Sequence, residues 1–429
     1  MLAMVVLVMP PVFQSLGILK LKFLEPPLKG EFMTSSQPTV CILGGGFGGL
    51  YTALRLSQLP WGNQQPLIYL VDRNDRFLFS PLLYELVTGE LQSWEIAPPY
   101  SELLANTKVR FIQSAVQQID VEQQQITLSD QSLPYNQLVL ALGGETPLQQ
   151  VPGSAEYALP FRTVQDAYQL EERLRVLETS AAPKIRVAVV GAGPSGVELA
   201  CKLADRLGER GRIRLIERNS QILKSASAFN QTAASKALEK RQVWIDLDTS
   251  VQSLATDEMT LSYKDQVDTL PVDLVLWTVG TAIADPIQAL PLPHNELGQL
   301  VVEPTLQVQN SPNIFALGDL ADYRDQQGQP TPKTAQVAIQ QADCVGWNIW
   351  ASLTQRPLLP FHYTHLGEML TLGEDTATMS GLGVQLDGPL AFIARRMIYL
   401  YRMPTLDHQL KIGVNWMLKP LISVLSPTQ

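Results

Sequence analysis

VCILGGGFGGL, residues 40–50, is the stretch that decides the fold. Its apolar start leads into Gly44, Gly46 and Gly49, in Gly-x-Gly-x-x-Gly spacing, and a helical pattern follows. These glycines permit a tight turn, a close approach of the backbone to a pyrophosphate, and close packing of helix on strand. The next apolar run ends on Asp72, about 20 residues further on, where a carboxylate accepts hydrogen bonds from ribose hydroxyls. This region therefore predicts a βαβ unit that binds a dinucleotide.

The same pattern occurs a second time. Residues 186–190 form an apolar run, Gly191, Gly193 and Gly196 repeat the spacing, and Glu217 ends the next predicted strand. One such match is weak, because glycine-rich turns are common, but the two copies share the strand, the helix and the acidic residue in register. Two units imply two dinucleotides. The usual pair in one chain is a flavin dinucleotide that stays bound and a nicotinamide dinucleotide that exchanges.

The remaining strands indicate how the two units are connected. An apolar strand, residues 313–317, ends in Gly318-Asp319, which would put a carboxylate near the ribityl chain of a flavin, although an ordinary strand exit looks the same. Residues 137–142 and 273–279 are predicted crossover strands, the second ending at Gly280. We therefore expect an α/β fold with two Rossmann-like domains, in which the nicotinamide domain splits the flavin domain. The expected boundaries are 1–37 for an N-terminal extension that is loose or upstream of the true start, 38–160 and 283–350 for the FAD-binding domain, 161–282 for the NAD(P)H-binding domain, and 351–429 for a C-terminal region.

The composition narrows the class of function. At 429 residues the chain is long enough for two or three domains, and its 45% apolar residues indicate a folded protein. A net charge of −9 argues against a nucleic-acid partner, which would require a basic surface. The three cysteines lie far apart and form no Cys-x-x-Cys pair. The sequence therefore predicts neither a disulfide framework nor a metal site, and a reducing compartment fits best.

Five motifs, in order, carry a family resemblance: GGGFGG, ALGG, GAGPSGVELA, LWTVG and FALGD. They resemble the type II NAD(P)H:quinone oxidoreductases. Residues 94–98, 346–350, 356–361 and 366–373 resemble the cyanobacterial and plastid demethylphylloquinone reductase branch. The resemblance implies FAD as the bound cofactor, NADPH or NADH as donor, and a membrane quinone as acceptor. That quinone would be a naphthoquinone such as demethylphylloquinone, or else plastoquinone, and the enzyme would pump no protons.

The resemblance also implies catalytic roles for three residues. Gln336 and Gln340 belong to a quinone motif and share a helix face, where two amides would bond the quinone carbonyls. The alternative is a helix that packs small residues against FAD. Glu198 would relay between donor and acceptor, or would simply be a first-turn acid stabilised by the helix N-terminus. The residues expected to contact FAD are Gly44, Gly46, Phe47, Gly49, Asp72, Asp319, Ala335 and Gln336, and those expected to contact NAD(P)H are Gly191, Gly193, Gly196, Glu198, Glu217 and Gly280.

Glu217 and its neighbours give opposite indications about the donor. The carboxylate favours NADH, because it bonds the free ribose hydroxyls and repels a 2′-phosphate. Arg214, Arg218 and Lys224 are close enough in the sequence to meet that phosphate. The branch resembled here is associated with NADPH. We expect both donors to work, with NADPH preferred.

The C-terminal region carries two amphipathic helical patterns. Residues 390–402 and 410–425 place apolar side chains on one face and polar or basic ones, among them Arg395, Arg402 and Lys411, on the other. Basic amphipathic helices lie in the interface of anionic membranes. We therefore expect a peripheral enzyme on the cytoplasmic side of a plasma or thylakoid membrane. The apolar faces could instead pack on the fold or in a homodimer.

Two rival functions remain open from the sequence. A sulfide:quinone oxidoreductase of the same fold needs paired redox cysteines over the flavin. Cys41 and Cys201 lie in a predicted strand and a predicted helix, and Cys344 has no evident partner. A flavoprotein that only senses NAD(P)H is the other rival, and it would reduce its flavin once and stop.

Overall fold

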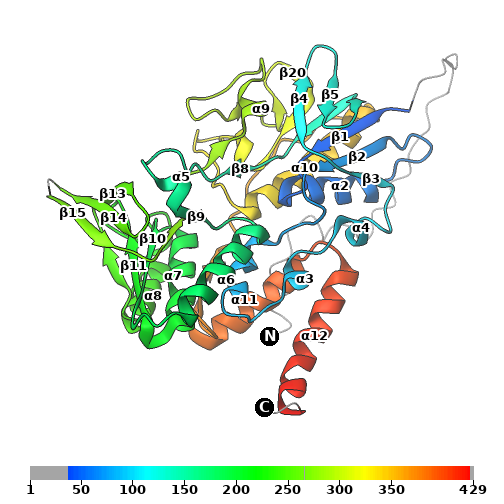
Figure 1. The fold of residues 1–429 in the computed structure, drawn as a ribbon. Helices are drawn as coiled ribbons and strands as arrows, with labels where there is room; N and C mark the ends of the chain where they lie inside the picture. Colours follow the sequence, from blue (N-terminus) through cyan, green and yellow to red (C-terminus); the bar gives the residue numbers. More distant parts are fainter. Residues whose placement is uncertain (1–36, 265, 426–429) are drawn as a thin grey trace, which may run out of the picture.

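The computed structural model describes residues 37–264 and 266–425. The expected N-terminal extension therefore lies outside the described residues, except for Gln37. The described chain forms two α/β units side by side, with two C-terminal helices beneath them (Figure 1). Among the described helices, none combines the length and the apolar character that crossing a bilayer requires.

The first unit is built on a six-stranded sheet with the order β19-β20-β7-β1-β2-β3. Its strands are parallel except β19, which runs antiparallel to β20. Every residue of the central strand β7 is buried, as expected for a strand covered on both faces. Helices α2 and α10 pack against each other on one side (Figure 1). The elements are β1 (Thr39–Leu43), α2 (Phe47–Gln58), β2 (Leu67–Asp72), β3 (Val109–Gln113), β7 (Gln137–Leu140), β19 (Gln307–Val308), β20 (Ser311–Ala316) and α10 (Ala335–Leu353).

The second unit contains a five-stranded parallel sheet with the order β12-β11-β10-β16-β9. All its strands lie between β7 and β20 in the chain, so this unit is inserted into the first. Its elements are β9 (Ala158–Pro160), α6 (Val164–Thr179), β10 (Ile185–Val190), α7 (Pro194–Leu207), β11 (Gly211–Ile216), α8 (Ala228–Lys240), β12 (Trp244–Asp246) and β16 (Leu274–Trp277). The α/β fold with two such units agrees with the prediction.

A shared hydrophobic core joins the two units. Segment η2 (Ser80–Leu86) contributes the buried Leu82 and Leu83 to this core, and it contacts both α6 and α7. The carboxyl-terminal edges of the two sheets, where ligands bind in such folds, are thereby held in one arrangement.

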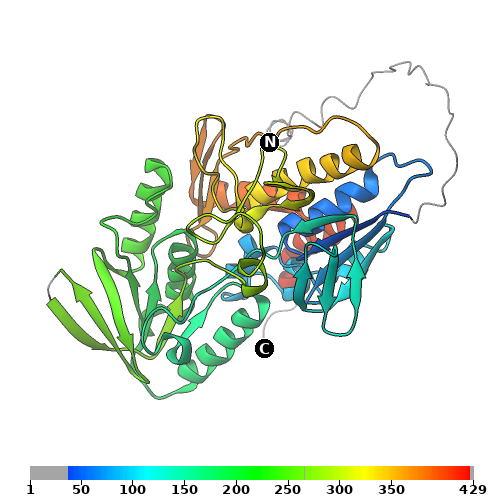
Figure 2. The same ribbon diagram turned by 90° about the horizontal axis from the view of Figure 1, so that it is seen from above.

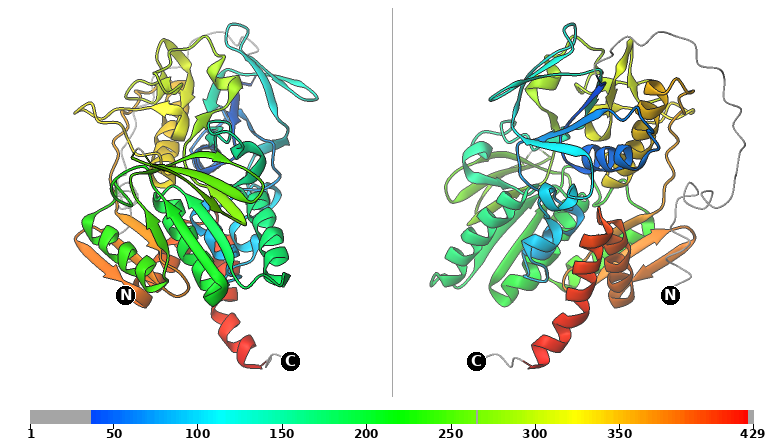
Figure 3. Two further views of the ribbon diagram at one scale, coloured as in Figure 1. Left: turned by 60° about the vertical axis from the view of Figure 1, so that its left-hand side comes forward. Right: turned by 90° about the vertical axis from the view of Figure 1, so that its right-hand side faces the viewer.

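The C-terminal region begins with a small antiparallel sheet, drawn in orange beside α8 in Figure 2. Its strands are β22 (Glu368–Thr371), β23 (Ala377–Gly381) and β24 (Val384–Asp387). Helix α11 (Gly388–Arg402) packs on β23 and β24, and α12 (Leu406–Leu425) points away from the body (Figure 3). These are the two helices predicted from the amphipathic pattern.

Candidate active site

The two glycine loops have the same backbone geometry. Gly44 and Gly191 open the loops with φ angles of 97° and 102°, a left-handed conformation that favours glycine. A Cβ added at Gly49 would lie 1.7 Å from the carbonyl oxygen of Gly44, and one at Gly196 would lie 1.8 Å from that of Gly191. Helix and strand thus approach so closely in each unit that no side chain fits between them.

The helices after these loops begin without side-chain caps. Gly46 is the N-cap of α2 and Gly193 that of α7, and no side chain bonds the backbone N–H groups there. A Cβ at either glycine would meet nothing within 4 Å. Helices α6, α8 and α10, by contrast, are capped by Thr163, Ser227 and Thr334. Two uncapped helix starts that face open space suit an anion such as a pyrophosphate.

The two acidic residues hold the glycine loops. Asp72 accepts a 2.6 Å hydrogen bond from the N–H of Gly45, and Glu217 accepts one of 2.8 Å from the N–H of Ala192. Each also accepts one from the backbone N–H of the asparagine two positions further on. Because a carboxylate has about four acceptor sites, both can still receive a ribose hydroxyl. The sequence predicts the ribose contact but gives no sign that these residues also fix the loops.

A third turn completes the carboxyl edge of the first sheet. Gly318, with a φ of 70°, follows β20 and donates a 2.7 Å hydrogen bond from its N–H to Gln341 of α10. Asp319 comes next and forms a 2.7 Å ion pair with Arg162. Its carboxylate lies 3.6 Å from where a Cβ of Gly144 would be, so the turn also reaches the segment that follows β7. This edge therefore gathers the first glycine loop, the crossover strand and an acidic residue, an arrangement that fits a flavin dinucleotide.

Two further residues of the predicted site lie at the same sheet edges. Phe47, the first residue of α2, packs its ring edge-on against Phe77, with 5.2 Å between the centroids. Gly280, with a φ of 86°, lies beyond the end of β16. Its neighbour Val279 lies against the second glycine loop, where it would clash with a side chain at Gly191.

Gln336 and Gln340 share one face of α10, as predicted, and both contact residues 363–367. The Oε1 atom of Gln336 accepts hydrogen bonds from the Tyr363 hydroxyl, at 2.8 Å, and from a backbone N–H of that segment, at 3.0 Å. Gln340 bonds the backbone of the segment at 2.9 and 3.0 Å. Ala335 begins the helix and is half-buried. A quinone carbonyl would have to share or replace these amide contacts.

Glu198 lies in a buried cluster of charged residues. Its Oε1 atom accepts a 2.8 Å hydrogen bond from the N–H of Thr371 and lies 3.6 Å from Nη2 of Arg395. Arg395 is fully buried, pairs with Glu85, and donates a 2.7 Å hydrogen bond to the carbonyl of Pro81. Burial raises the pKa of Glu198 to about 8, although Arg395 opposes this. Burial acts in the same direction on Glu85, but nearby cations, Arg395 foremost, outweigh it and lower the pKa of that residue.

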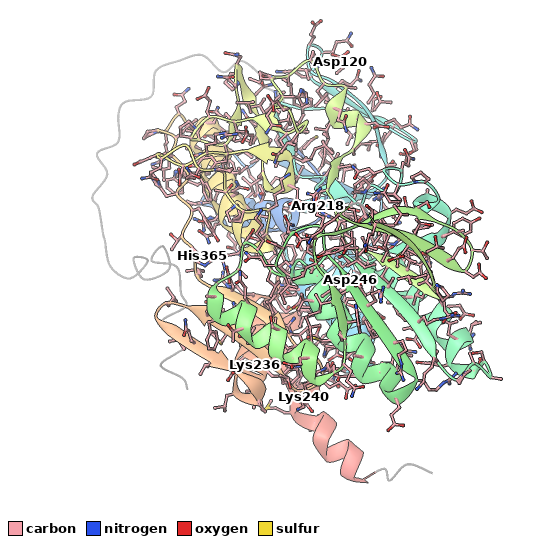
Figure 4. All side chains as sticks on the ribbon, turned by 90° about the vertical axis from the view of Figure 1, so that its left-hand side faces the viewer. Asp120, Arg218, Lys236, Lys240, Asp246 and His365 are labelled. Carbon is pink, nitrogen blue, oxygen red and sulfur yellow. The ribbon has the colours of Figure 1, made fainter. Side chains whose placement is uncertain are left out.

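The basic residues near Glu217 differ in their surroundings. Arg214 forms a 3.2 Å ion pair with Asp246 and lies over the ring of Trp244. Arg218 and Lys224 are exposed. Figure 4 shows Arg218 at the end of the second unit that is nearer the first. Arg218 is therefore better placed than Arg214 to meet a 2′-phosphate.

The three cysteines are free thiols in three different elements. Cys41 lies in β1, Cys201 in α7 and Cys344 in α10. Burial raises the pKa of each thiol to about 12, whereas redox chemistry requires the thiolate. The described chain includes all three cysteines and offers no pair of the kind that sulfide oxidation needs.

The orientation of α11 differs from the prediction. Arg395 is expected on a polar face opposite the apolar residues, but α11 buries Ala391, Phe392 and Arg395 and exposes Leu390 and Ile393. The expected surface role of Arg395 is therefore wrong, because the buried carboxylates inside require a cation. The sequence does contain one sign that a buried cation is needed. Glu85 is a carboxylate within the mainly apolar segment 77–87, and a buried charge needs a partner of opposite charge.

Comparisons with known proteins agree with this geometry. A family model for pyridine nucleotide-disulphide oxidoreductases matches residues 38–342. The chain is 56% identical to demethylphylloquinone reductase NdbB of Synechocystis sp., over 91% of this chain and 98% of that protein. It is 42% identical to alternative NAD(P)H-ubiquinone oxidoreductase C1, chloroplastic/mitochondrial, of Arabidopsis thaliana, over 92% and 83% of the two chains. NDH2 from Plasmodium falciparum, solved in complex with NADH, has the same fold, with a TM-score of 0.80 at 18% identity over 90% and 98% of the chains.

The match to the family model covers both glycine loops, and the similarity to the two relatives covers more than nine-tenths of this chain. The chain therefore belongs to the pyridine nucleotide-disulphide oxidoreductase family and, within it, to the type II NAD(P)H:quinone oxidoreductases.

Proposed function

We propose that this enzyme oxidises NADPH or NADH through bound FAD and reduces a membrane naphthoquinone, demethylphylloquinone foremost and plastoquinone as the alternative. The observation that carries the proposal is the pair of uncapped helix starts at Gly46 and Gly193, each beside an acidic residue that fixes its loop. Two such sites in one chain suit two dinucleotides. The identity of 56% to a demethylphylloquinone reductase supports the choice of quinone.

The first unit is the proposed FAD site. The N–H groups at the start of α2 would bind the pyrophosphate, Asp72 a ribose hydroxyl and Asp319 the ribityl chain, while Phe47 and Ala335 would line the site. The bound flavin supplies the two-electron chemistry that lets a hydride donor and a quinone react in turn. The chain itself fixes this edge through the contacts of Asp72 with Gly45 and of Asp319 with Arg162.

The second unit is the proposed NAD(P)H site. The start of α7 would bind the pyrophosphate, Glu217 a ribose hydroxyl and Arg218 a 2′-phosphate, with Gly280 leaving room for the nicotinamide half. Glu198 is the proposed relay between donor and acceptor. Support comes from its burial and from its raised pKa of about 8, because such a carboxyl group can gain and lose a proton near neutral pH.

The quinone is proposed to bind beside Gln336 and Gln340. Both amides lie on the face of α10 that contacts residues 363–367, at the carboxyl edge of the first sheet. Both amides would hold residues 363–367 in place, and on quinone binding some of these hydrogen bonds would be replaced by bonds to a quinone carbonyl. Their existing contacts favour a role in positioning the segment as well as in binding.

An outer stripe of exposed apolar side chains supports a peripheral location on a membrane. On α12, the partly buried Asn415 and Trp416 bond Glu95, at 3.1 and 2.8 Å, and the exposed Lys411 pairs with Glu102 on the surface at 2.7 Å. With these polar groups engaged by the protein, the opposite face presents apolar residues to its surroundings. The outer stripe consists of Leu390, Ile393, Met397, Leu406, Leu410, Val414, Met417 and Leu418.

The charges in this region are less available than the sequence indicates. Arg395 is buried, and Arg396 lies 3.8 Å from Glu90 and over the rings of Phe392 and Trp416. We therefore propose that the outer stripe makes the main membrane contact, on the cytoplasmic side, and that anionic lipids contribute less. The alternative is that a second copy of this chain covers the outer stripe in a homodimer.

Identification of the bound cofactor and steady-state turnover of the purified enzyme test the proposed function. We expect denatured enzyme to release FAD, and NADPH and NADH to support many turnovers with menadione, a naphthoquinone without an isoprenoid tail. A protein that only senses NAD(P)H would reduce its flavin once and then stop, so the absence of steady-state quinone reduction would favour that rival. Release of FMN would contradict the dinucleotide assignment of the first loop.

A further inference from the structure

A chain of hydrogen bonds leads from the surface to α10. The Tyr363 hydroxyl donates to Oε1 of Gln336 at 2.8 Å, and its oxygen lies 3.1 Å from Nδ1 of His365. Because the hydroxyl has one proton and gives it to Gln336, the second bond needs a proton on Nδ1 of His365. His365 is exposed (Figure 4), whereas Tyr363 is half-buried. The two hydrogen bonds therefore point the same way, from His365 at the surface through Tyr363 to Gln336.

The inner end of this chain lies at the carboxyl edge of the first sheet. Gln336 is in the first turn of α10, and the next turn packs on Gly318. The N–H of Gly318 bonds Gln341, and a Cβ on Gly318 would lie 3.8 Å from Ala338. Gly318 precedes Asp319 in the turn assigned to the flavin. Tyr363 thus bonds the first turn of the helix whose next residues pack on the turn proposed to bind the flavin.

We propose that Tyr363 donates a proton to the quinone and that His365 resupplies it from solvent. This inference rests on the proposed quinone reduction. A quinone becomes a quinol by gaining two electrons and two protons, of which a bound flavin would supply both electrons and one proton. The second proton must come from elsewhere, and the Tyr363 hydroxyl points at an acceptor oxygen, Oε1 of Gln336, whose position a quinone oxygen can take.

Each proton transfer in this series of hydrogen bonds breaks one bond to hydrogen and forms another. The O–H bond of Tyr363 breaks and an O–H bond forms on the quinone oxygen. As the Nδ1 proton of His365 passes to the tyrosinate, Nε2 of the same ring takes up a proton from solvent, so the imidazole stays neutral throughout. Gln336 orients the hydroxyl until the quinone oxygen takes the place of its Oε1 atom, and it transfers no proton itself.

The surroundings keep Tyr363 protonated until an acceptor is present. Burial raises the pKa of Tyr363, and the carboxylate of Glu368 acts in the same direction. Tyr363 also lines a cavity of about 390 Å³ together with Tyr323, Asp325 and His362. The charge that acts on Tyr363 most clearly is thus the carboxylate of Glu368, which disfavours a resting tyrosinate.

Rapid mixing of the reduced holoenzyme with two acceptors tests the proposal. Menadione needs protons, whereas ferricyanide takes electrons without them. Tyr363→Phe should slow flavin reoxidation by menadione about 100-fold, the low end of what a positioned acid contributes, and leave ferricyanide unaffected. His365→Asn should slow menadione about tenfold, and imidazole in the buffer should restore the rate. The control is His362→Asn, which removes a neighbouring exposed imidazole that takes no part in these hydrogen bonds. This variant should change neither the menadione rate nor the ferricyanide rate.

A second readout is independent of turnover. The protein has four histidines, so their ring nitrogens can be followed by ¹⁵N NMR. We expect neutral His365 to carry its proton on Nδ1 in the unaltered protein and to shift to Nε2 in Tyr363→Phe, which has no oxygen to accept it.

The outcomes separate this inference from the function on which it rests. Equal slowing with menadione and ferricyanide, an unchanged menadione rate in Tyr363→Phe, or an Nε2-protonated His365 in the unaltered protein would overturn the proton path. If the unaltered enzyme reduces ferricyanide and no quinone, the proposed function fails instead.

Discussion

Arg395 and Glu85, 310 positions apart in the chain, form an ion pair in which neither side chain is exposed. Arg395 lies on α11, and Glu85 lies on η2, which contacts α6 and α7 of the second unit and contributes to the core shared by both units. The pair therefore attaches the C-terminal helices to the junction that sets the relative position of the two sheet edges. Because burying one charge alone is far more costly than burying the pair, the two residues are expected to act as a unit.

Arg395→Met should lower the free energy of unfolding by about 3–5 kcal/mol, because it leaves Glu85 buried without its main partner. Adding Glu85→Gln should recover most of the loss. Denaturant unfolding of the flavin-bound protein measures both changes. Arg175→Met is the control: Arg175 pairs with Glu172 on the surface, where both are more than half exposed, and its loss should cost under about 1 kcal/mol. A single Arg395 variant as stable as this control would contradict the account of the buried pair.

Leu410→Ser, Val414→Ser and Met417→Ser, combined in one variant, should abolish sedimentation with liposomes without loss of the bound flavin. All three side chains lie on the outer stripe and are about half or more exposed, so their replacement removes little of the core. Cosedimentation with neutral and anionic vesicles measures the effect, and we expect similar binding to both.

Leu297→Ser provides the matched control, since Leu297 is 71% exposed and lies outside the outer stripe. Unchanged liposome binding by the triple variant would show that the stripe is not the anchor. If the triple variant instead converts a dimer to a monomer, the stripe is a subunit interface.

Glu198→Gln should remove a pH dependence of stability. The pKa of Glu198 is about 8 in the folded protein, against 4.5 as the ordinary value for the residue. Between these values the folded protein holds a proton that the unfolded chain releases, so this residue makes the free energy of unfolding fall as the pH rises. The variant should therefore become more stable relative to the unaltered protein between about pH 5 and pH 8. Urea unfolding of the variant and of the unaltered protein at pH 5 and at pH 8 measures this change. If the difference between their free energies of unfolding is the same at both pH values, Glu198 ionises normally.

Glu217→Gln should shift the ratio of kcat/KM for NADPH over NADH roughly tenfold towards NADPH, which corresponds to about 1.4 kcal/mol. The carboxylate repels a 2′-phosphate, and Arg218 remains exposed beside it. Steady-state kinetics with both donors measure the ratio, and the unaltered enzyme should use both while preferring NADPH. An unchanged ratio, with both donors equally weakened, would mean that Glu217 serves only to hold the loop through Ala192.

The sequence predicts what depends on local pattern. Gly44, Gly49, Gly191 and Gly196 could be placed because each must be glycine for steric reasons within one βαβ unit. The burial of Arg395 could not be predicted, because an amphipathic pattern shows two faces of a helix without showing which one faces the core.

Contacts between distant segments also escape the sequence pattern. The link from Gln336 to Tyr363 joins a helix to a loop 27 positions away, and nothing local to either residue indicates it. The second role of Asp72 was hidden for a different reason: the carboxylate that suits a ribose equally suits the N–H of Gly45.

A double-mixing experiment determines whether this one chain passes electrons from a nicotinamide to a quinone through its own FAD. Flavin absorbance is followed while the oxidised protein is mixed first with NADPH and then with menadione. We predict that NADPH bleaches the flavin, that menadione restores it, and that both steps are at least as fast as steady-state turnover. A reduced flavin that oxygen reoxidises but menadione does not would contradict the account.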